Sequence, residues 1–260
     1  MFLPQLLSRA ASGEKLTMLT CYDASFARML AENGLDCLLI GDSLGMTVQG
    51  HATTLPVTVE QMAYHTEAVA RGAAGKAFII ADLPFGSYQK DAGQAFDAAA
   101  RLMSAGANMV KLEGGAIMVE TVGFLTRRGI PVCGHLGLLP QSVNTTGYRA
   151  QAREAAAAAQ LVRDAGDLEA AGAQMLVLES IPALVAGEVT GKLAIPTIGI
   201  GAGVHCSGQV LVLQDLLGLT EKPPRFAKDF MNGAQNIPAA IRAYVAAVRS
   251  GSFPGPEHSF

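Results

Sequence analysis

The sequence has few charged residues and no cluster of basic ones. Of its 260 residues 16% are charged, and 19 Lys and Arg against 22 Asp and Glu give a formal net charge of −3. Without a run of Lys or Arg, the chain lacks the positive surface that non-specific binding to nucleic acid requires. We therefore expect no nucleic-acid partner. Because 50% of the residues are hydrophobic, we also expect a folded chain rather than a disordered one.

Long apolar runs and paired cysteines are missing as well. No stretch approaches the roughly 20 apolar residues that a membrane-spanning helix needs, and residues 1–7 do not form the charged leader and apolar run of a signal peptide. The 4 cysteines lie far apart and form no CxxC pair: Cys21, Cys37, Cys133 and Cys206. This spacing is typical of reduced, buried thiols. We therefore expect a cytoplasmic protein with no membrane partner.

Eight short apolar runs alternate with helix-like segments along the chain. Nearly all of these runs end in Gly, Pro or an acidic residue, which is typical of strands buried on both faces of a parallel sheet. We predict strands at Leu16–Tyr22, Cys37–Gly41, Ala77–Ala81, Asn108–Leu112, Pro131–Gly134, Gln174–Leu178, Pro196–Ile200 and Gln209–Leu213. We predict helices at Ser25–Glu32, Val59–Arg71, Gly93–Ser104, Ile117–Arg128, Ala152–Ala171 and Ala183–Gly191.

Eight strands in a chain of this length favour a closed α/β barrel over an open doubly wound sheet. A (β/α)8 barrel, or TIM barrel, typically takes about 250 residues, so we expect residues 1–260 to form one domain. From about residue 220 the chain continues into a helix-like segment at Ile237–Arg249 and a Gly/Pro-rich tail. We interpret this part as a C-terminal helical extension of the barrel.

Glycines mark the ends of several helices and one loop. Gly34, Gly106 and Gly172 each follow a predicted helix, where a left-handed cap is common. The segment Gly199–Gly203 follows the seventh predicted strand and fits either a phosphate-binding loop or close packing at a turn. The sequence does not decide between these two interpretations.

Ionisable residues end five of the predicted strands. In a barrel of this type, the loops at the carboxyl ends of the strands build the active site. Because side chains alternate along a strand, Lys111 and Glu113 share the face opposite Leu112, and the same parity pairs Ile40 with Asp42. The residues that we place at the barrel mouth are Asp42, Ser43, Asp82, Lys111, Glu113, His135 and Glu179.

Carboxylates that meet at one mouth repel each other unless a cation or a proton lies between them. The oxygen ligands of Asp42, Asp82 and Glu113 suit a hard divalent ion such as Mg²⁺, which keeps positions for water or substrate. Lys111 would add a fixed positive charge for a substrate carboxylate or oxyanion. Glu179 is then free to act as a base.

Each of these residues also has a structural interpretation. Asp42 or Asp82 alone is typical of a helix N-cap, and Lys111 with Glu113 is typical of a local ion pair. His135 alone is typical of a packed histidine. The coincidence of five ionisable strand ends favours the functional interpretation.

Six motifs of the chain are long and specific. They are GDSLGMTVQGH (41–51), TLPVT (54–58), ADLPF (81–85), GANMVKLEGG (106–115), PVCGHLGL (131–138) and IGIGAG (198–203). These motifs closely resemble those of the ketopantoate hydroxymethyltransferase (3-methyl-2-oxobutanoate hydroxymethyltransferase) family. The resemblance extends from about Leu16 to the tail Pro254–Phe260, which is nearly the whole chain.

The resemblance implies transfer of a hydroxymethyl group from 5,10-methylenetetrahydrofolate to 3-methyl-2-oxobutanoate through a Mg²⁺-stabilised enolate. The product is 2-dehydropantoate (ketopantoate), in the first committed step of pantothenate and coenzyme A synthesis. The resemblance also implies one Mg²⁺ per subunit, the folate as co-substrate, and a homodecamer built as a pentamer of dimers.

The resemblance assigns roles residue by residue. Asp42 and Asp82 resemble the metal ligands of the family, with Glu113 as a third, directly or through water. Glu179 resembles the proton acceptor, and Lys111 a second catalytic residue. The substrate-binding set is Asp42, Ser43, Asp82, Lys111 and His135, of which the histidine has no defined role.

Two places depart from the family pattern. Thr146 and Ala152 lie in the segment Asn144–Arg153, where the family tends to have more glycine and a different basic pattern, and Ser207 stands where an aspartate is common. These departures affect the loop conformation and any folate contact made there.

Two other classes of function stay open. One is another Mg²⁺-dependent oxoacid enzyme of the phosphoenolpyruvate mutase or isocitrate lyase type, which the KLEGG and GDSLGMTVQGH motifs argue against. The other is an inactive barrel that serves as a binding scaffold. Such a barrel would be expected to lack a metal ligand or the base, and the sequence retains all of them.

Overall fold

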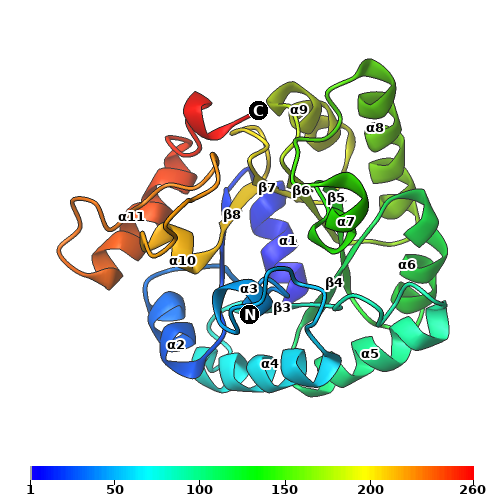
Figure 1. Cartoon of the computed structure of the whole chain (residues 1–260), viewed down its shortest axis with the longest axis horizontal. Helices are drawn as coiled ribbons and strands as arrows, with labels where there is room; N and C mark the ends of the chain where they lie inside the picture. The colour runs from blue at the N-terminus through cyan, green and yellow to red at the C-terminus, as the bar shows by residue number, and fades with distance from the viewer. Residues whose placement is uncertain (1) are drawn as a thin grey trace.

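Eight parallel strands form a closed barrel in which each strand pairs with the next along the chain and β8 pairs with β1 (Figure 1). The computed structural model describes residues 2–260. The strands are β1 (Leu16–Thr20), β2 (Cys37–Ile40), β3 (Phe78–Asp82), β4 (Met109–Glu113), β5 (Val132–Gly137), β6 (Met175–Glu179), β7 (Thr197–Ile200) and β8 (Gly208–Leu211). The predicted barrel is confirmed, and the predicted strands are displaced by a few residues at their ends.

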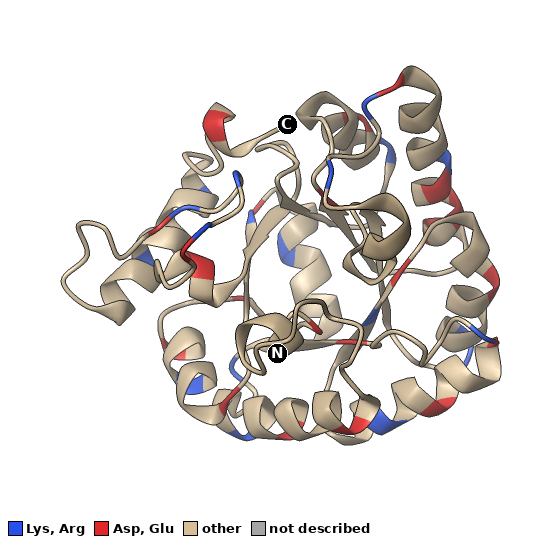
Figure 2. Ribbon diagram, viewed as in Figure 1, with Lys and Arg blue, Asp and Glu red and all other residues tan. Residues whose placement is uncertain are grey.

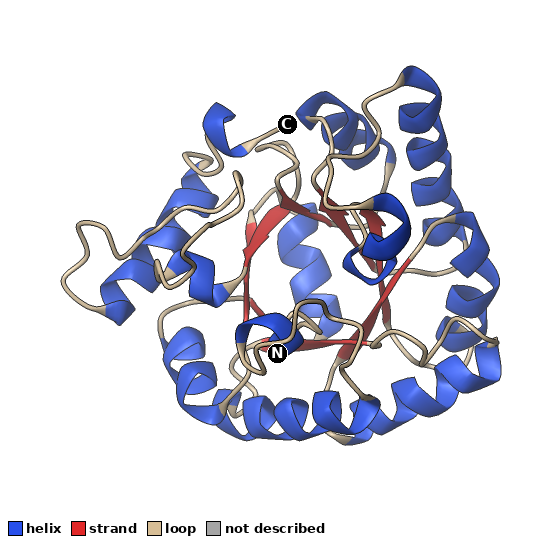
Figure 3. Cartoon of the chain, in the orientation of Figure 1, coloured by secondary structure: helices blue, strands red, loops and turns tan. Residues whose placement is uncertain are grey.

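Helices surround the ring of strands (Figure 3). The longer ones are α2 (Ala24–Glu32), α4 (Val59–Ala73), α5 (Ala92–Ser104), α6 (Val119–Thr126), α8 (Ala155–Ala170), α9 (Ala183–Lys192) and α11 (Ile237–Ser250). Short helices are α3 (Leu44–Thr47), α7 (Val143–Thr146) and α10 (Leu213–Leu216), with 3-10 turns η1 (Ala116–Met118), η2 (Pro140–Ser142) and η3 (Pro256–His258). Within residues 2–260, no helix is both long and apolar enough to cross a membrane.

Local sequence signals start several of these helices. Asp23 and Asp91 accept backbone N–H groups at the starts of α2 and α5, and Thr58 forms a capping box with Gln61 at the start of α4. Such side chains satisfy backbone donors that have no partner within the helix. Most charged residues lie on the outer helices and loops, and few lie on the strands (Figure 2).

Strand side chains alternate between the barrel interior and the layer beneath the helices. On β4, Met109 belongs to the inner apolar cluster, whereas Val110 and Leu112 belong to the outer one. Lys111 and Glu113 therefore face the interior, as parity predicts. The parity prediction for β2 is wrong, because Leu39 is the inner residue and Ile40 is an outer one.

Helix α1 (Leu3–Ala11) closes the end of the barrel opposite the carboxyl ends of the strands. It lies within the ring of strands in Figure 1, and the side chain of Leu6 is fully buried in the inner cluster with Leu16 and Met18. Pro4 occupies the first turn of α1, where its missing N–H has no cost. No pattern in the sequence predicted this helix.

A charged cluster ties α1 to the barrel. The buried carboxylate of Asp36, just before β2, accepts both the backbone N–H and the hydroxyl of Thr17 at 2.8 Å. It also lies 2.7 Å from Arg9 of α1 and 3.2 Å from Arg249 of α11. This end of the molecule therefore buries an acid that has a complete set of partners.

The glycines of the segment Gly199–Gly203 pack closely against neighbouring side chains. A Cβ atom on Gly199 would come within 2.9 Å of Cys206 Sγ. A Cβ atom on Gly201 would lie 3.0 Å from the rings of both Phe226 and Phe260. The packing interpretation of this segment fits the structure. Gly34, Gly106 and Gly172 have the positive φ angles of left-handed helix ends.

Candidate active site at the barrel mouth

The polar residues predicted at the strand ends meet around one cavity at the barrel mouth. Its volume is about 120 Å³, which suits a small molecule rather than a drug-sized one. Its polar wall contains all of the predicted site residues: Asp42, Ser43, Asp82, Lys111, Glu113, His135 and Glu179. Its apolar wall includes Leu39, Val177, Ile200, Val210 and Phe226. The cavity therefore combines an ionic side with a hydrocarbon side.

Asp42, Asp82 and Lys111 form the ionic side of the cavity. Asp82 on β3 and Lys111 on β4 are register partners, and Lys111 Nζ lies 3.0 Å from Asp82 Oδ1. Asp42 reaches the mouth because the chain turns after Ile40, and its backbone N–H donates to Asp82 Oδ2 at 3.1 Å. Neither aspartate caps a helix, so the N-cap interpretation is wrong for both.

His135 lies between two carboxylates. It is the register partner of Glu113, and its Nδ1 atom lies 3.5 Å from Glu113 Oε1 and 3.4 Å from Lys111 Nζ. Its Nε2 atom lies 3.3 Å from Glu179 Oε2. Gly137 is the register partner of Glu179, and any Cβ atom there would collide with the carbonyl of Glu179. A glycine therefore allows β5 to approach the strand that carries Glu179.

Gln141 connects the carboxylates but was not predicted from the sequence. Its Nε2 donates to Asp42 Oδ2 at 2.8 Å and to the carbonyl of Leu83 at 2.9 Å. Its backbone N–H donates to Glu113 Oε2 at 3.0 Å, and its Oε1 accepts the hydroxyl of Tyr88 at 2.7 Å. An uncharged amide in the η2 turn gives no signal by residue type. Only its position a few residues after β5, at the mouth end, could have indicated it.

Ser43 is held by an aromatic hydroxyl from another strand end. Its Oγ atom lies 2.9 Å from the hydroxyl of Tyr22, which follows β1. Burial raises the pKa of Tyr22 to about 12, so this phenol keeps its proton at neutral pH. The pair offers a neutral hydrogen-bonding group beside the ionic side of the cavity.

The mouth holds more carboxyl groups than cationic groups. Burial raises the pKa of Asp42 to about 8, and the charges of Asp82 and Glu113 add to this rise. Burial also raises the pKa of Asp82, against the opposing charge of Lys111. Burial acts against the charge of Lys111, but Asp82, Glu113 and Asp42 outweigh it and raise the pKa of Lys111 above its usual value. Four carboxyl groups thus crowd around one ammonium group. Burial and this crowding hold a proton on Asp42 at neutral pH, and a bound cation can take the place of that proton.

Glu113 and His135 form a pair that is partly compensated. Burial acts against the charge of both groups. Their mutual contact nevertheless lowers the pKa of Glu113 and helps to raise the pKa of His135, to which Glu179 also contributes. His135 is therefore no isolated packed histidine, because its ring nitrogens lie within 3.5 Å of two carboxylates.

The residues present fit a hard divalent ion at the two aspartates. Asp82 Oδ1 is buried and accepts no hydrogen bond of good geometry within the described chain, although Lys111 is near. Residues 2–260 hold no group of three or more His, Cys, Asp or Glu side chains arranged as a metal site. Glu113 instead contacts His135 and Gln141. Two aspartates suffice for Mg²⁺, which commonly binds one or two carboxylates and keeps its waters. The role of Glu113 as a metal ligand stays a prediction.

Comparisons with known proteins point to one family. The model of the family described as ketopantoate hydroxymethyltransferase matches residues 1–256. A 3-methyl-2-oxobutanoate hydroxymethyltransferase of Thiobacillus denitrificans is 64% identical over 249 residues, which is 95% of this chain and 95% of that one. The enzyme of the same name from Burkholderia multivorans is 61% identical over 259 residues, 99% of this chain and 95% of that one.

Solved structures with low identity share the barrel. A phosphoenolpyruvate phosphomutase from Streptomyces platensis subsp. rosaceus has a TM-score of 0.63 at 13% identity, covering 84% of this chain and 83% of that one. A phosphonopyruvate hydrolase in complex with oxalate and Mg²⁺ has a TM-score of 0.61 at 14% identity, covering 99% and 93%. At such identity the likeness establishes the fold alone.

Proposed function

Because the chain belongs to the ketopantoate hydroxymethyltransferase family, we propose that it transfers a hydroxymethyl group to 3-methyl-2-oxobutanoate and forms 2-dehydropantoate. We propose 5,10-methylenetetrahydrofolate as the donor. One oxoacid, one donor and one water then give one ketopantoate and one tetrahydrofolate, so water supplies the new hydroxyl oxygen. Beyond family membership, the single observation that carries this function is the small cavity in which carboxylates, one ammonium and an apolar wall meet.

The oxoacid fits this cavity by its two chemically different ends. Its carboxylate and keto oxygens suit the ionic side, where the ammonium group of Lys111 is fully charged and held by Asp82. Its isopropyl group suits the apolar wall at Val177, Ile200 and Val210. A charge held in place before the reaction needs no reorganisation when the keto oxygen becomes negative. Lys111 therefore serves both binding and catalysis.

A divalent cation completes the ionic side in this proposal. Asp42 and Asp82 would hold it directly, and Glu113 through water. When bound, such an ion polarises the keto carbonyl and makes the neighbouring C–H more acidic. The support for Mg²⁺ is the oxygen-only ligand set and the buried Asp82 Oδ1, whose one near partner within residues 2–260 is Lys111.

Glu179 is the base that removes the proton from C3 of the oxoacid. Its side chain is 15% exposed, which leaves it open to the cavity, and His135 lies 3.3 Å away and orients it. Loss of the proton leaves the C–H electron pair to form a carbon–carbon double bond, while negative charge develops on the keto oxygen near Lys111. The nucleophilic C3 then attacks the methylene carbon of the donor, after one of its two C–N bonds has opened to an iminium. Water breaks the other C–N bond, which leaves the hydroxymethyl group on C3 and releases tetrahydrofolate.

The test is a hydroxymethyl-transfer assay in which the metal is removed by a chelator and then restored. We expect product only when Mg²⁺, the oxoacid and the folate donor are all present. In the absence of the donor, we expect the native protein with Mg²⁺ to exchange the C3 proton of the oxoacid with D₂O. Neither exchange nor transfer by the native protein would contradict the proposed function.

We propose further that the protein works as a decamer in the cytoplasm. The decamer is supported by large apolar side chains on the barrel exterior, since Ile117 is 81% exposed and Leu184 is 86% exposed. The cytoplasm is supported by four buried cysteines that form no disulfide in the described chain. Light scattering should give a mass of about ten times the 26.9 kDa of one chain. A monomer mass would contradict the decamer.

A further inference from the structure

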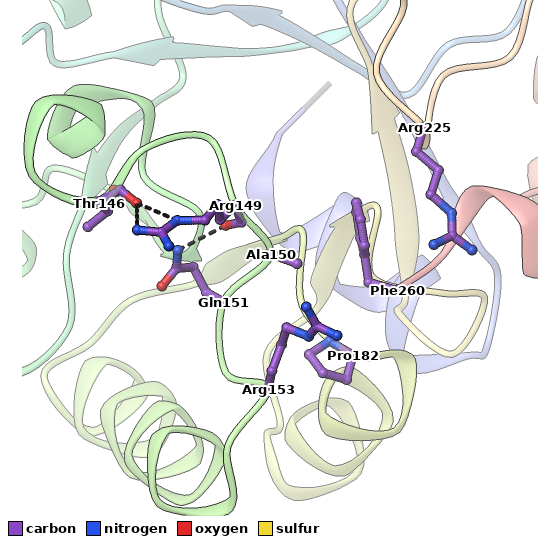
Figure 4. A pocket seen from close by; sticks show the side chains of 8 residues that line it. All are labelled: Thr146, Arg149, Ala150, Gln151, Arg153, Pro182, Arg225 and Phe260. Atoms are coloured by element: carbon purple, nitrogen blue, oxygen red, sulfur yellow. Dashed lines mark hydrogen bonds between the residues drawn. The ribbon is translucent and has the colours of Figure 1, made fainter.

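A second and larger cavity lies beside the barrel mouth. Its volume is about 740 Å³, within the range of about 300–1,000 Å³ that is typical of ligand sites. It is lined by Thr146, Arg149, Ala150, Gln151, Arg153, Pro182, Arg225 and Phe260 (Figure 4). None of these residues belongs to the cavity at the mouth. The role of the second cavity is therefore separate from oxoacid binding.

The lining of this cavity is strongly basic. Arg149 and Arg153 come from the segment after α7, and Arg225 comes from the loop after α10. No aspartate or glutamate lines the cavity, and none of the three guanidinium groups forms an ion pair with any of residues 2–260. Three cations line this cavity without an aspartate or glutamate beside them, so the cavity favours an anion.

The guanidinium groups keep most of their donors free. Arg149 donates only to the carbonyl of Thr146, at 3.4 Å, and Arg225 only to the carbonyl of Glu257, at 3.1 Å. No side-chain hydrogen bond of Arg153 is recorded among the described residues. In Figure 4 the ring of Phe260 stands between Arg225 and Ala150, and Arg153 lies beside Pro182. Arg225 lies over the Phe260 ring, 5.4 Å from its centre. The site thus offers guanidinium groups beside an aromatic face.

This basic cavity adjoins the catalytic cavity at several points. Arg225 precedes Phe226, which lines the mouth. Pro182 follows Glu179 by three residues, so their Cα atoms are at most about 11 Å apart. The backbone N–H of Gln151 donates to the carbonyl of Ser180, next to the base, at 2.9 Å. A ligand held in the basic cavity therefore ends near the reacting carbon.

We propose that the basic cavity binds the glutamate tail of the folate donor and so directs the one-carbon unit toward Glu179. This inference rests on the proposed function. The tail carries carboxylates, whose paired oxygens match the forked donors of arginine. An aminobenzoyl ring separates this tail from the one-carbon unit, and the Phe260 face offers a surface for that ring to contact. The segment Asn144–Arg153, whose sequence departs from the family pattern, forms one side of the cavity.

The test compares two ligands that differ only in the tail. Tetrahydrofolate carries the glutamate, and tetrahydropteroate lacks it. Calorimetric titration should give native protein a Kd for tetrahydrofolate at least about tenfold lower than for tetrahydropteroate, as expected for charge-assisted hydrogen bonds. The double variant Arg153→Gln with Arg225→Gln should lose this preference and bind tetrahydropteroate as the native protein does.

The matched control is Arg28→Gln, which removes an exposed arginine from α2 on the barrel exterior. It should keep the native preference for the tail. The proposal is overturned if the double variant keeps the preference, if it loses affinity for both ligands equally, or if the native protein has no preference. Proton exchange of the oxoacid by native protein needs no folate. If native protein exchanges the C3 proton normally and any of these outcomes is found, only the role of the basic cavity is rejected. If native protein shows neither proton exchange nor hydroxymethyl transfer, the proposed function is rejected as well.

Discussion

The two ends of the barrel both bury charged side chains, but the chain supplies these side chains with different sets of partners. At the closed end, Asp36 accepts two hydrogen bonds from Thr17 and meets the guanidinium groups of Arg9 and Arg249. At the mouth, four carboxyl groups share one ammonium group, and the buried Asp82 Oδ1 has only Lys111, 3.0 Å away, as a partner within residues 2–260. The closed end needs nothing further, whereas the mouth needs a ligand.

This difference separates stability from function within one fold. A buried acid with every partner supplied by the chain holds α1, β1 and α11 together. A buried acid cluster that the chain leaves incomplete costs stability unless a cation or substrate completes it. Substitutions at the closed end should therefore change folding, and substitutions at the mouth should change the reaction.

The largest effect should follow Glu179→Gln at the mouth. The amide keeps the size of the side chain but cannot take a proton, so the rate of C3–H exchange should fall about 10²- to 10⁴-fold. Exchange is measured by NMR in D₂O with Mg²⁺ and 3-methyl-2-oxobutanoate. The matched control is Glu188→Gln, which removes an exposed carboxylate of α9 paired with Lys192. C3–H exchange at the native rate in Glu179→Gln would show that Glu179 is not the base.

The next largest effect should follow Asp36→Asn at the closed end. It removes the buried acid between Arg9 and Arg249, which then share only the partly exposed Glu14. Both arginines are also partly screened because their side chains are 28% and 39% exposed. We expect the free energy of unfolding to fall by about 2–3 kcal/mol. Urea denaturation measures it.

The control for this change is Asp97→Asn, on the exposed face of α5, which should alter stability by less than about 0.5 kcal/mol. The exchange rate per folded molecule should stay native in Asp36→Asn. If Asp36→Asn greatly slowed C3–H exchange but left stability unchanged, the separation of stability and function between the two ends would be contradicted.

A smaller effect should follow Gln141→Leu, which removes the amide that positions Asp42. Because groups that orient metal ligands commonly tune affinity, the Mg²⁺ concentration for half-maximal activity should rise about tenfold. Gln160→Leu, on the exposed side of α8, serves as the control. A lower rate with unchanged Mg²⁺ dependence would mean that Gln141 acts on packing alone.

The smallest effect should follow Ala74→Gly, at a residue that belongs to neither charged cluster. Ala74 ends α4 in the left-handed region with φ of 48°, and its side chain is exposed. Glycine removes the steric strain that alanine has at this positive φ angle. Part of this gain is lost because glycine makes the unfolded chain more flexible, so the free energy of unfolding should rise by about 0.5 kcal/mol. Ala159→Gly within α8 should lower it by about 1 kcal/mol. Thermal unfolding distinguishes the two, and a loss of stability in both would contradict the prediction.

Strand parity predicted much of the mouth. Lys111, Glu113 and Glu179 lie on regular strands, where alternation fixes the face that each side chain takes. The same rule failed for Ile40, because β2 ends there and the turn that follows carries Asp42 to the mouth. Periodicity predicts a side chain only as far as the strand extends.

Other features could not be predicted because they depend on distant contacts. Gln141 is an uncharged residue in a turn, and its role exists only because Asp42 and Glu113 lie beside it. Helix α1 is short, and it is buried only because strands that follow it in the sequence form a barrel around Leu6. Arg153 and Arg225 lie far apart in sequence and line one cavity only after folding.

The most direct test of the incomplete mouth is calorimetric titration of native protein with 3-methyl-2-oxobutanoate, with and without Mg²⁺. We predict clear binding with Mg²⁺ and little or none without it, because Lys111 alone does not offset the carboxyl groups that face an anionic substrate. Equal binding of the oxoacid in the presence and absence of Mg²⁺ would contradict the account.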